Sequence, residues 1–251
     1  QVGFNARAAL ASMDLTKAGF PGPKRVFNGE HGYFKLIEND DYDISYLQEN
    51  IGKFWMVNQL AHKPFPSGRL THGLVHAIKD LKLKHGLNKD DIESIECLVP
   101  PGVYKLVARP IIDNLTTNYS KLCAKFVGAS FMINDHLNIE TFTEKKYLNN
   151  KDTLNFAKKI TMIKNDKLDQ KVLTPQKFII TLVNNSKIEI NIDHVYGHPK
   201  APLSEKEYLE KFSKCCFSST NKVDQNQVNR MLDFIFDLEN KDNVIDFFKT
   251  I

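Results

Sequence analysis

The sequence feature that most constrains the fold of this chain is a proline-rich stretch, HKPFPSGRLTH, at residues 62–72. Pro64 and Pro66 fix their own φ angles and push the residue before each of them into an extended conformation, so residues 63–66 cannot be helical. Ser67 and Gly68 form a turn pair, and glycine at this position allows the backbone to approach a ligand closely. The stretch therefore predicts a rigid loop that ends in a turn.

A helix is predicted directly after this loop, with Thr71 as its N-cap, because apolar residues recur at helical spacing over residues 73–85. The loop then brings Lys63, Ser67, Arg69 and His72 to the helix N-terminus, where free backbone N–H groups and the helix dipole favour an anion. Lysine and arginine bind carboxylates or phosphates, and histidine transfers protons near neutral pH. The alternative interpretation is a structural turn before an ordinary surface helix.

The composition is that of a globular protein with a sizeable core. The 251 residues are 42% hydrophobic and 25% charged, with a formal net charge of +4. The densest basic run, Lys79, Lys82, Lys84 and Lys89, follows the predicted helix and indicates a solvated face rather than a nucleic-acid footprint. No apolar run approaches the ~20 residues of a membrane span, and no secretory signal is visible. We therefore expect neither nucleic acid nor membrane as a partner.

The four cysteines, Cys97, Cys123, Cys215 and Cys216, have no C-x-x-C spacing, and a vicinal pair does not easily form an ordinary structural disulfide. We expect them to be reduced and the protein to be cytoplasmic. Gln1 stands inside a helical pattern with no capping signal before it, which indicates a truncated chain.

Strand and helix signals alternate from about residue 54 to residue 203, with helical segments on both sides. This layout predicts the α+β class, with a helical-domain segment at residues 1–52, an α/β domain at 53–203 and a second helical-domain segment at 204–251. A β-hairpin around Asn184-Asn185 and a capping box of Ser204 and Glu207 are the clearest local signals. The expected elements are helices at 4–18, 73–85, 118–133, 154–160, after Ser204 and at 228–238, and strands at 54–61, 92–99, 160–163, 178–183 and 188–192.

Motifs for common cofactors are missing from the sequence. His72 and His76 lie one helical turn apart, but no third metal ligand is placed by spacing, so we expect no metal site. There is no G-x-G-x-x-G, no P-loop and no G-x-S-x-G elbow, so we expect no nucleotide or other cofactor. Tyr104 and Arg109 stand near Pro110 and add a second cation beside a proline. A cation-rich site of this kind suits substrates with several carboxylates.

Five blocks of the sequence, GFNARAALASMDLTKAGFPGP, GEHGYF, HKPFPSGRLTHGLVHAIKDL, NYSKLCAKFVGA and VYGHPKAPLSEKEYLEKF, resemble consecutive blocks of the MmgE/PrpD family. That family includes 2-methylcitrate dehydratase, cis-aconitate decarboxylase and iminodisuccinate epimerase. The resemblance implies an α/β domain inserted between segments of an all-helical domain, and a homodimer. It also implies that this chain covers only the C-terminal half, and that a preceding helical half with further catalytic residues, including a lysine, is missing.

Within the chain, the resemblance matches Lys63 to the family lysine of K-x-F/Y-P and His72 to the histidine of the T-H pair. Ser67 and Gly68 fall where members vary, and the decarboxylase has a histidine at about Gly68. Many members carry an aspartate four residues after the T-H histidine, where this chain has His76. Tyr104 and Arg109 lie near the position of a site tyrosine of the decarboxylase.

The family reactions share a carbanion formed next to a carboxylate without metal or organic cofactor, and its growing charge requires fixed cations. The resemblance therefore implies catalytic roles for Lys63 and His72, and substrate contacts from Arg69, Ser67, Gly68, Tyr104 and Arg109. The expected activity is that of a cofactor-independent lyase of the 2-methylcitrate dehydratase type, acting on a di- or tricarboxylate. The alternatives are an epimerase, isomerase or decarboxylase on a related acid, or a non-catalytic remnant. We expect this fragment to be inactive alone.

Overall fold

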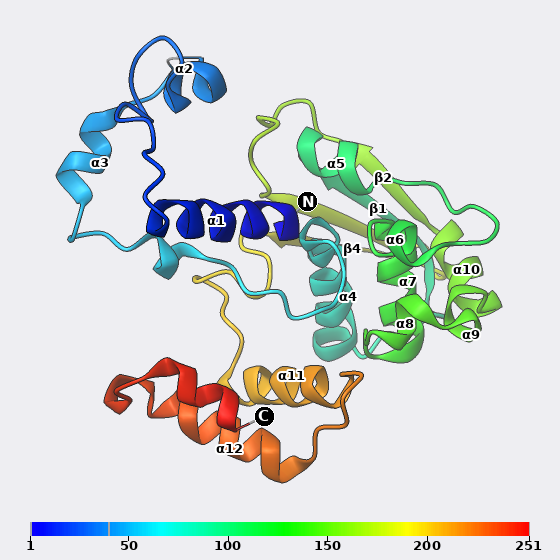
Figure 1. Ribbon diagram of the computed structural model, residues 1–251. Coiled ribbons are helices and arrows are strands. Elements are labelled where there is room, and N and C mark those ends of the chain that lie inside the picture. Colours follow the sequence, from blue (N-terminus) through cyan, green and yellow to red (C-terminus); the bar gives the residue numbers. More distant parts are fainter. Residues whose placement is uncertain (1, 40, 251) are drawn as a thin grey trace. The chain divides into compact units, whose positions relative to one another are not determined.

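The computed structural model describes residues 2–39 and 41–250 and divides into two units, one ending at Met56 and one beginning at Val57 (Figure 1). The first unit contains three helices: α1 (Val2–Lys17), α2 (Tyr33–Glu38) and α3 (Ile44–Asn50). Gly19, with φ +89°, ends α1 as the sequence predicts. α1 buries none of its described side chains, so this unit has little core of its own.

The second unit is built on a four-stranded mixed sheet with the strand order β2-β1-β3-β4. β1 runs parallel to β2 and antiparallel to β3, and β3 and β4 form the predicted hairpin, in which Asn185 takes the left-handed conformation (φ +66°). Ile190 and Ile192 of β4 are buried while Glu189 and Asn191 are exposed, which confirms the predicted alternation. The strands are β1 (Ile92–Val99), β2 (Ile160–Lys164), β3 (Gln176–Leu182) and β4 (Lys187–Ile192).

Helices α4 (His72–His85), α7 (Ala124–Asn134) and α10 (Lys151–Lys158) pack with the sheet around the hydrophobic core. Ile78 and Leu81 of α4, Phe126 of α7 and Phe178 of β3 are fully buried there. α4 and α7 approach closely at Gly128, where an added Cβ would lie 2.6 Å from Leu74 Cδ2. The small residue therefore permits the close contact between the two helices.

The remaining elements of the second unit and its start connect and flank this core. They are η1 (Met56–Gln59), η2 (Arg69–Thr71), α5 (Pro101–Val107), α6 (Thr117–Ser120), α8 (Glu140–Thr143), α9 (Lys145–Leu148), α11 (Glu205–Phe217), α12 (Gln225–Phe236), η3 (Leu238–Asn240) and η4 (Val244–Lys249). α11 begins with the predicted capping box, in which Ser204 Oγ accepts from the Glu207 N–H and the Glu207 carboxylate accepts from the Ser204 N–H. Among the described residues, no helix has both the length and the apolar character that a bilayer span requires.

Three local predictions are wrong. Residues 54–61 do not form a strand but contain the 3-10 helix η1, since their apolar residues find no neighbouring strand. The helix predicted at 118–133 is broken into α6 and α7, because the Lys121 carbonyl accepts the N–H of Gly68 and Cys123 is extended (φ −99°, ψ 99°). The basic run is not a uniformly solvated face either, as Lys79 and Lys82 are partly buried and paired with Glu207 and Asp135.

The fold therefore confirms an α+β domain with a small sheet and covering helices. The insertion of this domain between segments of a larger helical domain stays a prediction, as do the boundaries at residues 52 and 203.

Candidate functional site

The proline-rich loop is non-helical, as predicted, and leads through the 3-10 turn Arg69–Thr71 into α4. Thr71 is not the side-chain cap that the sequence predicts. Its backbone is helical (φ −83°, ψ −14°), and its Oγ1 donates to the Gly68 carbonyl at 2.8 Å. The N–H groups of Thr71 and His72 donate to the carbonyls of Gly68 and Arg69, so this helix N-terminus does not offer them to an anion.

A one-way series of hydrogen bonds links the polar side chains of this turn. Arg69 Nη1 lies 3.5 Å from His72 Nδ1, and because a guanidinium only donates, Nδ1 is the acceptor and Nε2 carries the proton. His72 Nε2 then donates to Ser67 Oγ at 3.0 Å, and Ser67 donates to Thr71 Oγ1 at 3.0 Å. Thr71 Oγ1 in turn donates a hydrogen bond to the Gly68 carbonyl at 2.8 Å. The turn is therefore internally satisfied and held in one conformation.

His72 is a neutral, fully buried imidazole. Burial, followed by the positive charges of Arg69 and Lys63, lowers the pKa of His72 to about 3. Its ring packs edge-on against Phe65, with ring centroids 5.3 Å apart. The sequence predicts a proton-transfer role for His72, but in the described structure Phe65 lines the adjacent pocket and His72 does not.

Arg69 ties the turn to the chain that follows β4. Its Nη1 donates to the Tyr196 carbonyl at 2.6 Å and its Nη2 to the Val195 carbonyl at 2.9 Å. The side chain is partly buried, and burial lowers the pKa of the guanidinium, which nevertheless remains charged. The contacts that the structure gives Arg69 are thus with backbone, in addition to the His72 imidazole.

Gly68 makes a close backbone approach, but to protein. Its N–H donates to the Lys121 carbonyl at 2.8 Å, and an added Cβ would lie 2.6 Å from Leu122 Cδ2. Ser67 is buried beside it. The structure therefore assigns both polar groups of Gly68 to internal hydrogen bonds, whereas the sequence predicts an approach to a ligand.

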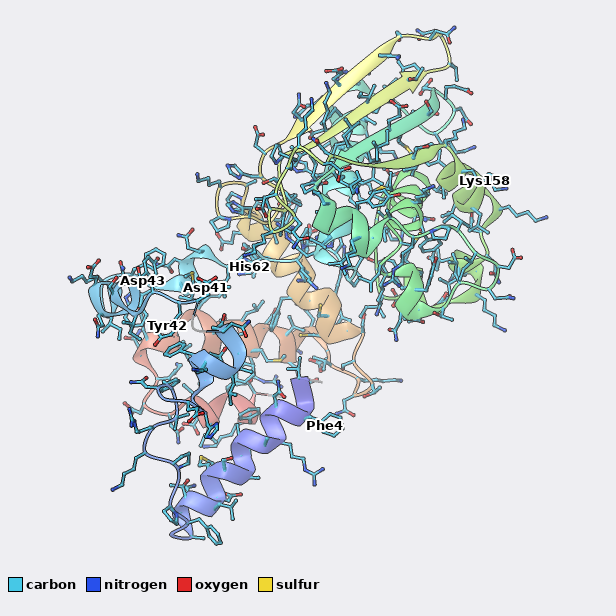
Figure 2. All side chains as sticks on the ribbon, turned by 90° about the horizontal axis from the view of Figure 1, so that it is seen from above. Phe4, Asp41, Tyr42, Asp43, His62 and Lys158 are labelled. Carbon is cyan, nitrogen blue, oxygen red and sulfur yellow. The ribbon has the colours of Figure 1, made fainter. Side chains whose placement is uncertain are left out.

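Of the predicted site residues, Lys63 alone lines a pocket beside the proline-rich loop in the described part of the chain. The pocket has a volume of about 870 Å³ and lies between the loop, the segment after α7 and α11. Lys63 is exposed, and its ammonium has no ion-pair partner among the described residues. The loop is fixed against α11 at His62, labelled in Figure 2, whose Nδ1 lies 2.7 Å from Tyr208 Oη. A pocket of this size accommodates a small organic ligand.

Sequence reasoning missed a second polar cluster in this pocket, made of Lys79, Tyr196 and Glu207. Lys79 Nζ lies 3.2 Å from Glu207 Oε1 and 4.2 Å from the centroid of the Tyr196 ring. Burial raises the pKa of Glu207, but hydrogen bonds from Tyr196, Ser204 and Lys79 outweigh burial and lower it to about 2. The capping box was the only sequence signal that pointed to Glu207, and nothing local joined it to Lys79.

Tyr104 and Arg109 do not line this pocket. Tyr104 is an exposed residue of α5. Arg109 donates from Nε to the Leu106 carbonyl at 3.3 Å and lies over the ring of Tyr119, 5.3 Å from its centroid. The structure therefore does not bring these two residues together with Lys63 around one cavity.

Residues 2–39 and 41–250 contain no group of three or more histidine, cysteine, aspartate or glutamate side chains that could hold a metal ion. His76 Nδ1 accepts the N–H of Tyr196 at 3.2 Å and His72 Nε2 bonds Ser67, so His72 and His76 have separate protein partners. The four cysteines are free thiols.

The small mixed sheet with its covering helices defines an α+β domain, and a pocket lined by Lys63 lies between the proline-rich loop, the segment after α7 and α11. Residues 65–234, more than half of the chain, match the model of the MmgE/PrpD C-terminal domain. The chain therefore belongs to the MmgE/PrpD family, as the sequence predicts.

Two curated relatives are cis-aconitate decarboxylases. The protein from Mus musculus is 23% identical over 228 residues and the protein from Homo sapiens is 23% identical over 220 residues. Each alignment covers 84% of this chain and 44% of the relative. The chain thus spans less than half the length of the curated relatives that it matches.

Proposed function

We propose that the protein is a cofactor-independent lyase that eliminates water from a di- or tricarboxylate. The observation that carries the proposal is the position of Lys63, whose exposed ammonium lines the pocket without an ion-pair partner in the described chain. Membership of a family with dehydratases and decarboxylases supports the same chemistry.

In this proposal, loss of a proton next to a substrate carboxylate places a second negative charge on that carboxylate. Lys63 stabilises the growing charge, because an ammonium fixed at the pocket wall needs no rearrangement during the reaction. The rest of the catalytic groups belong, in our proposal, to the part of the relatives that this chain does not cover.

His72 takes a positioning role in this proposal. Its imidazole is neutral, lies behind Phe65 and holds Ser67 and Arg69 in the turn that follows Lys63. The turn keeps the Lys63 backbone in place. In this proposal, His72 affects the reaction only through the position of Lys63.

We favour dehydration over decarboxylation because of Gly68. The family resemblance places a histidine of the decarboxylase at about this position, and here an added Cβ would meet Leu122 at 2.6 Å and the Lys121 carbonyl at 3.3 Å. A histidine at this position requires the Leu122 side chain to move.

The test is an assay of the intact protein with 2-methylcitrate and with cis-aconitate. Dehydration gives a rise in absorbance from a new C=C bond, without release of CO₂. Release of CO₂ from cis-aconitate identifies a decarboxylase, and solvent-deuterium incorporation without a new C=C bond identifies an epimerase or isomerase. If neither acid reacts or exchanges, the lyase proposal is wrong and a non-catalytic binding role is favoured.

A further inference from the structure

We propose that Lys211 and Lys214 of α11 form, together with Lys63, a subsite for a second carboxylate of the ligand. The pocket would then select di- and tricarboxylates over monocarboxylates. This inference rests on the proposed function, since it takes the pocket beside Lys63 as the substrate pocket.

The first argument is position. Lys211 and Lys214 are three residues apart on α11, so they lie on neighbouring turns of one helix face, and both line the pocket with Lys63. Lys211 Nζ donates to the Lys63 carbonyl, which fixes α11 against the proline-rich loop. Two lysines of α11 therefore line the same cavity as Lys63.

The second argument is charge. Glu207 and Asp135 also line the pocket, but their carboxylates are already bound, Glu207 by Lys79 at 3.2 Å and Asp135 by Lys82. By contrast, Lys63 and Lys214 have no ion-pair partner among the described residues. The positive charges of Lys63 and Lys211 both depress the pKa of the nearby His72, after the larger effects of burial and Arg69. Three lysines thus line this part of the pocket, two of them without an ion-pair partner in the described chain, and their positive charge favours an anion.

Glu140 and Glu210 also line the pocket, and the negative charge of Glu210 provides a further test of anion binding. Glu210 Oε1 lies 4.0 Å from Lys206 Nζ, at the limit of an ion pair. Its negative charge competes with a bound carboxylate, so its removal should strengthen anion binding.

The third argument is the apolar wall. Phe65, Phe131, Leu137 and Leu203 line the same cavity and can contact a short carbon skeleton between two carboxylates. A monocarboxylate contacts this wall and one cation, whereas a polycarboxylate also reaches a second cation.

The experiment is titration calorimetry at low ionic strength on the intact protein, with propane-1,2,3-tricarboxylate and butyrate as probes. The tricarboxylate has no hydroxyl group to eliminate, so its binding is measured without dehydration. We expect it to bind at least tenfold more tightly than butyrate. Lys214→Met should weaken tricarboxylate binding roughly tenfold, the size of one charge-assisted hydrogen bond, and leave butyrate binding unchanged.

Further variants test whether the effect depends on a positive charge at residue 214. Lys214→Arg should retain tricarboxylate affinity, and Glu210→Gln should raise it several-fold. Lys222→Met removes an exposed lysine that follows α11 and does not line this pocket, and it should change the binding of neither ligand. Unfolding midpoints of all variants should match that of the unmodified protein, because these side chains lie at the surface, in α11 or after it.

Equal affinity for the two probes, or unchanged tricarboxylate affinity in Lys214→Met, would overturn the subsite. The proposed function is tested by a separate result, the dehydration of 2-methylcitrate. If the subsite is present but 2-methylcitrate is not dehydrated, the protein binds polycarboxylates without this reaction. If 2-methylcitrate is dehydrated with the same KM in Lys214→Met, the lyase proposal stands and the subsite does not.

Discussion

His72 Nε2 lies 3.0 Å from Ser67 Oγ, and this hydrogen bond closes the turn between the proline-rich loop and α4. The imidazole that makes it is neutral and fully buried, with the permanently charged Arg69 at its other nitrogen. A cation is therefore stabilised on one side of the ring, and the ring itself cannot easily take a proton. This relationship makes the turn sensitive to acid.

The first prediction is a pH dependence of stability that arises from His72. Its pKa is about 3 in the folded protein and about 6.5 in the unfolded chain, so as pH falls the unfolded state binds the proton first. The contribution is complete above pH 6.5 and is lost between about pH 6.5 and pH 3, with a slope of at most about 1.4 kcal/mol per pH unit. Urea unfolding between pH 7 and pH 4.5 measures it.

His72→Gln is the matched variant, because glutamine keeps a donor for Ser67 but does not titrate. It should show a smaller loss of unfolding free energy over this pH range than the unmodified protein. His85→Gln, which changes an exposed histidine of the same helix, serves as the control. An unchanged slope in His72→Gln would contradict a buried neutral His72.

The second prediction concerns Lys63. In the intact enzyme, Lys63→Met should lower kcat by about 10²–10³, the range found when a single donor to a developing oxyanion is removed. The unfolding midpoint should stay the same, because the Lys63 side chain is exposed and only its carbonyl is bound, by Lys211. Steady-state kinetics and thermal unfolding measure the two effects, and a variant with undiminished turnover would exclude Lys63 from the reaction.

The third prediction tests the contact between α4 and α7. An alanine at Gly128 would place a Cβ 2.6 Å from Leu74 Cδ2 and 2.8 Å from Leu74 Cγ, inside the buried core. We expect Gly128→Ala to destabilise the protein by about 1–3 kcal/mol, because overpacking outweighs the better helix propensity of alanine.

A double-mutant cycle with Leu74→Ala distinguishes overpacking from other causes. Leu74→Ala alone opens a cavity and should cost about 2–5 kcal/mol. In the double variant the new methyl group of residue 128 occupies part of that space, so the combined loss should be smaller than the sum of the single losses. Strict additivity in urea unfolding would show that the two residues are not in contact.

Much of the fold could be predicted because its signals are local. The hairpin around Asn185, the strand at residues 92–99 and the capping box of Ser204 each depend on residues close together in the sequence. The break between α6 and α7 was missed because its cause is a distant residue, Gly68, whose N–H uses the Lys121 carbonyl. Apolar spacing continues across the break and gives no sign of it.

Of the residues that line the candidate site, the sequence predicted Lys63 alone. Lys63 lines a pocket, and the sequence identified it from its neighbouring prolines and from the family resemblance. His72 and Arg69 were expected to face a ligand, but a polar residue type does not reveal whether its partner is a substrate or a backbone carbonyl. The residues that join α4 to α11, Lys79 and Glu207, are 128 residues apart, and no local pattern links them.

The last prediction concerns this link. Glu207 accepts hydrogen bonds from the Ser204 N–H at 2.9 Å and from Lys79 Nζ at 3.2 Å, and its pKa is lowered to about 2 against 4.5 for an unperturbed glutamate, by hydrogen bonds that outweigh burial. Since the lowered pKa belongs to the folded state, the stabilisation is present above about pH 4.5 and is lost as pH falls towards 2. Because about a third of the Glu207 side chain is exposed, solvent screens much of the interaction.

Glu207→Gln should therefore reduce the free energy of unfolding at pH 7 by up to about 1 kcal/mol, because glutamine keeps the capping box but loses the charge paired with Lys79, and should flatten the acid side of the stability profile. Glu205→Gln is the matched control, since Glu205 lies in the same first turn of α11 and has the same favourable interaction with the helix dipole. If both variants lose equal stability in urea at pH 7, the helix dipole accounts for the effect. A larger loss in Glu207→Gln instead assigns the difference to the ion pair with Lys79 that holds α11 against α4.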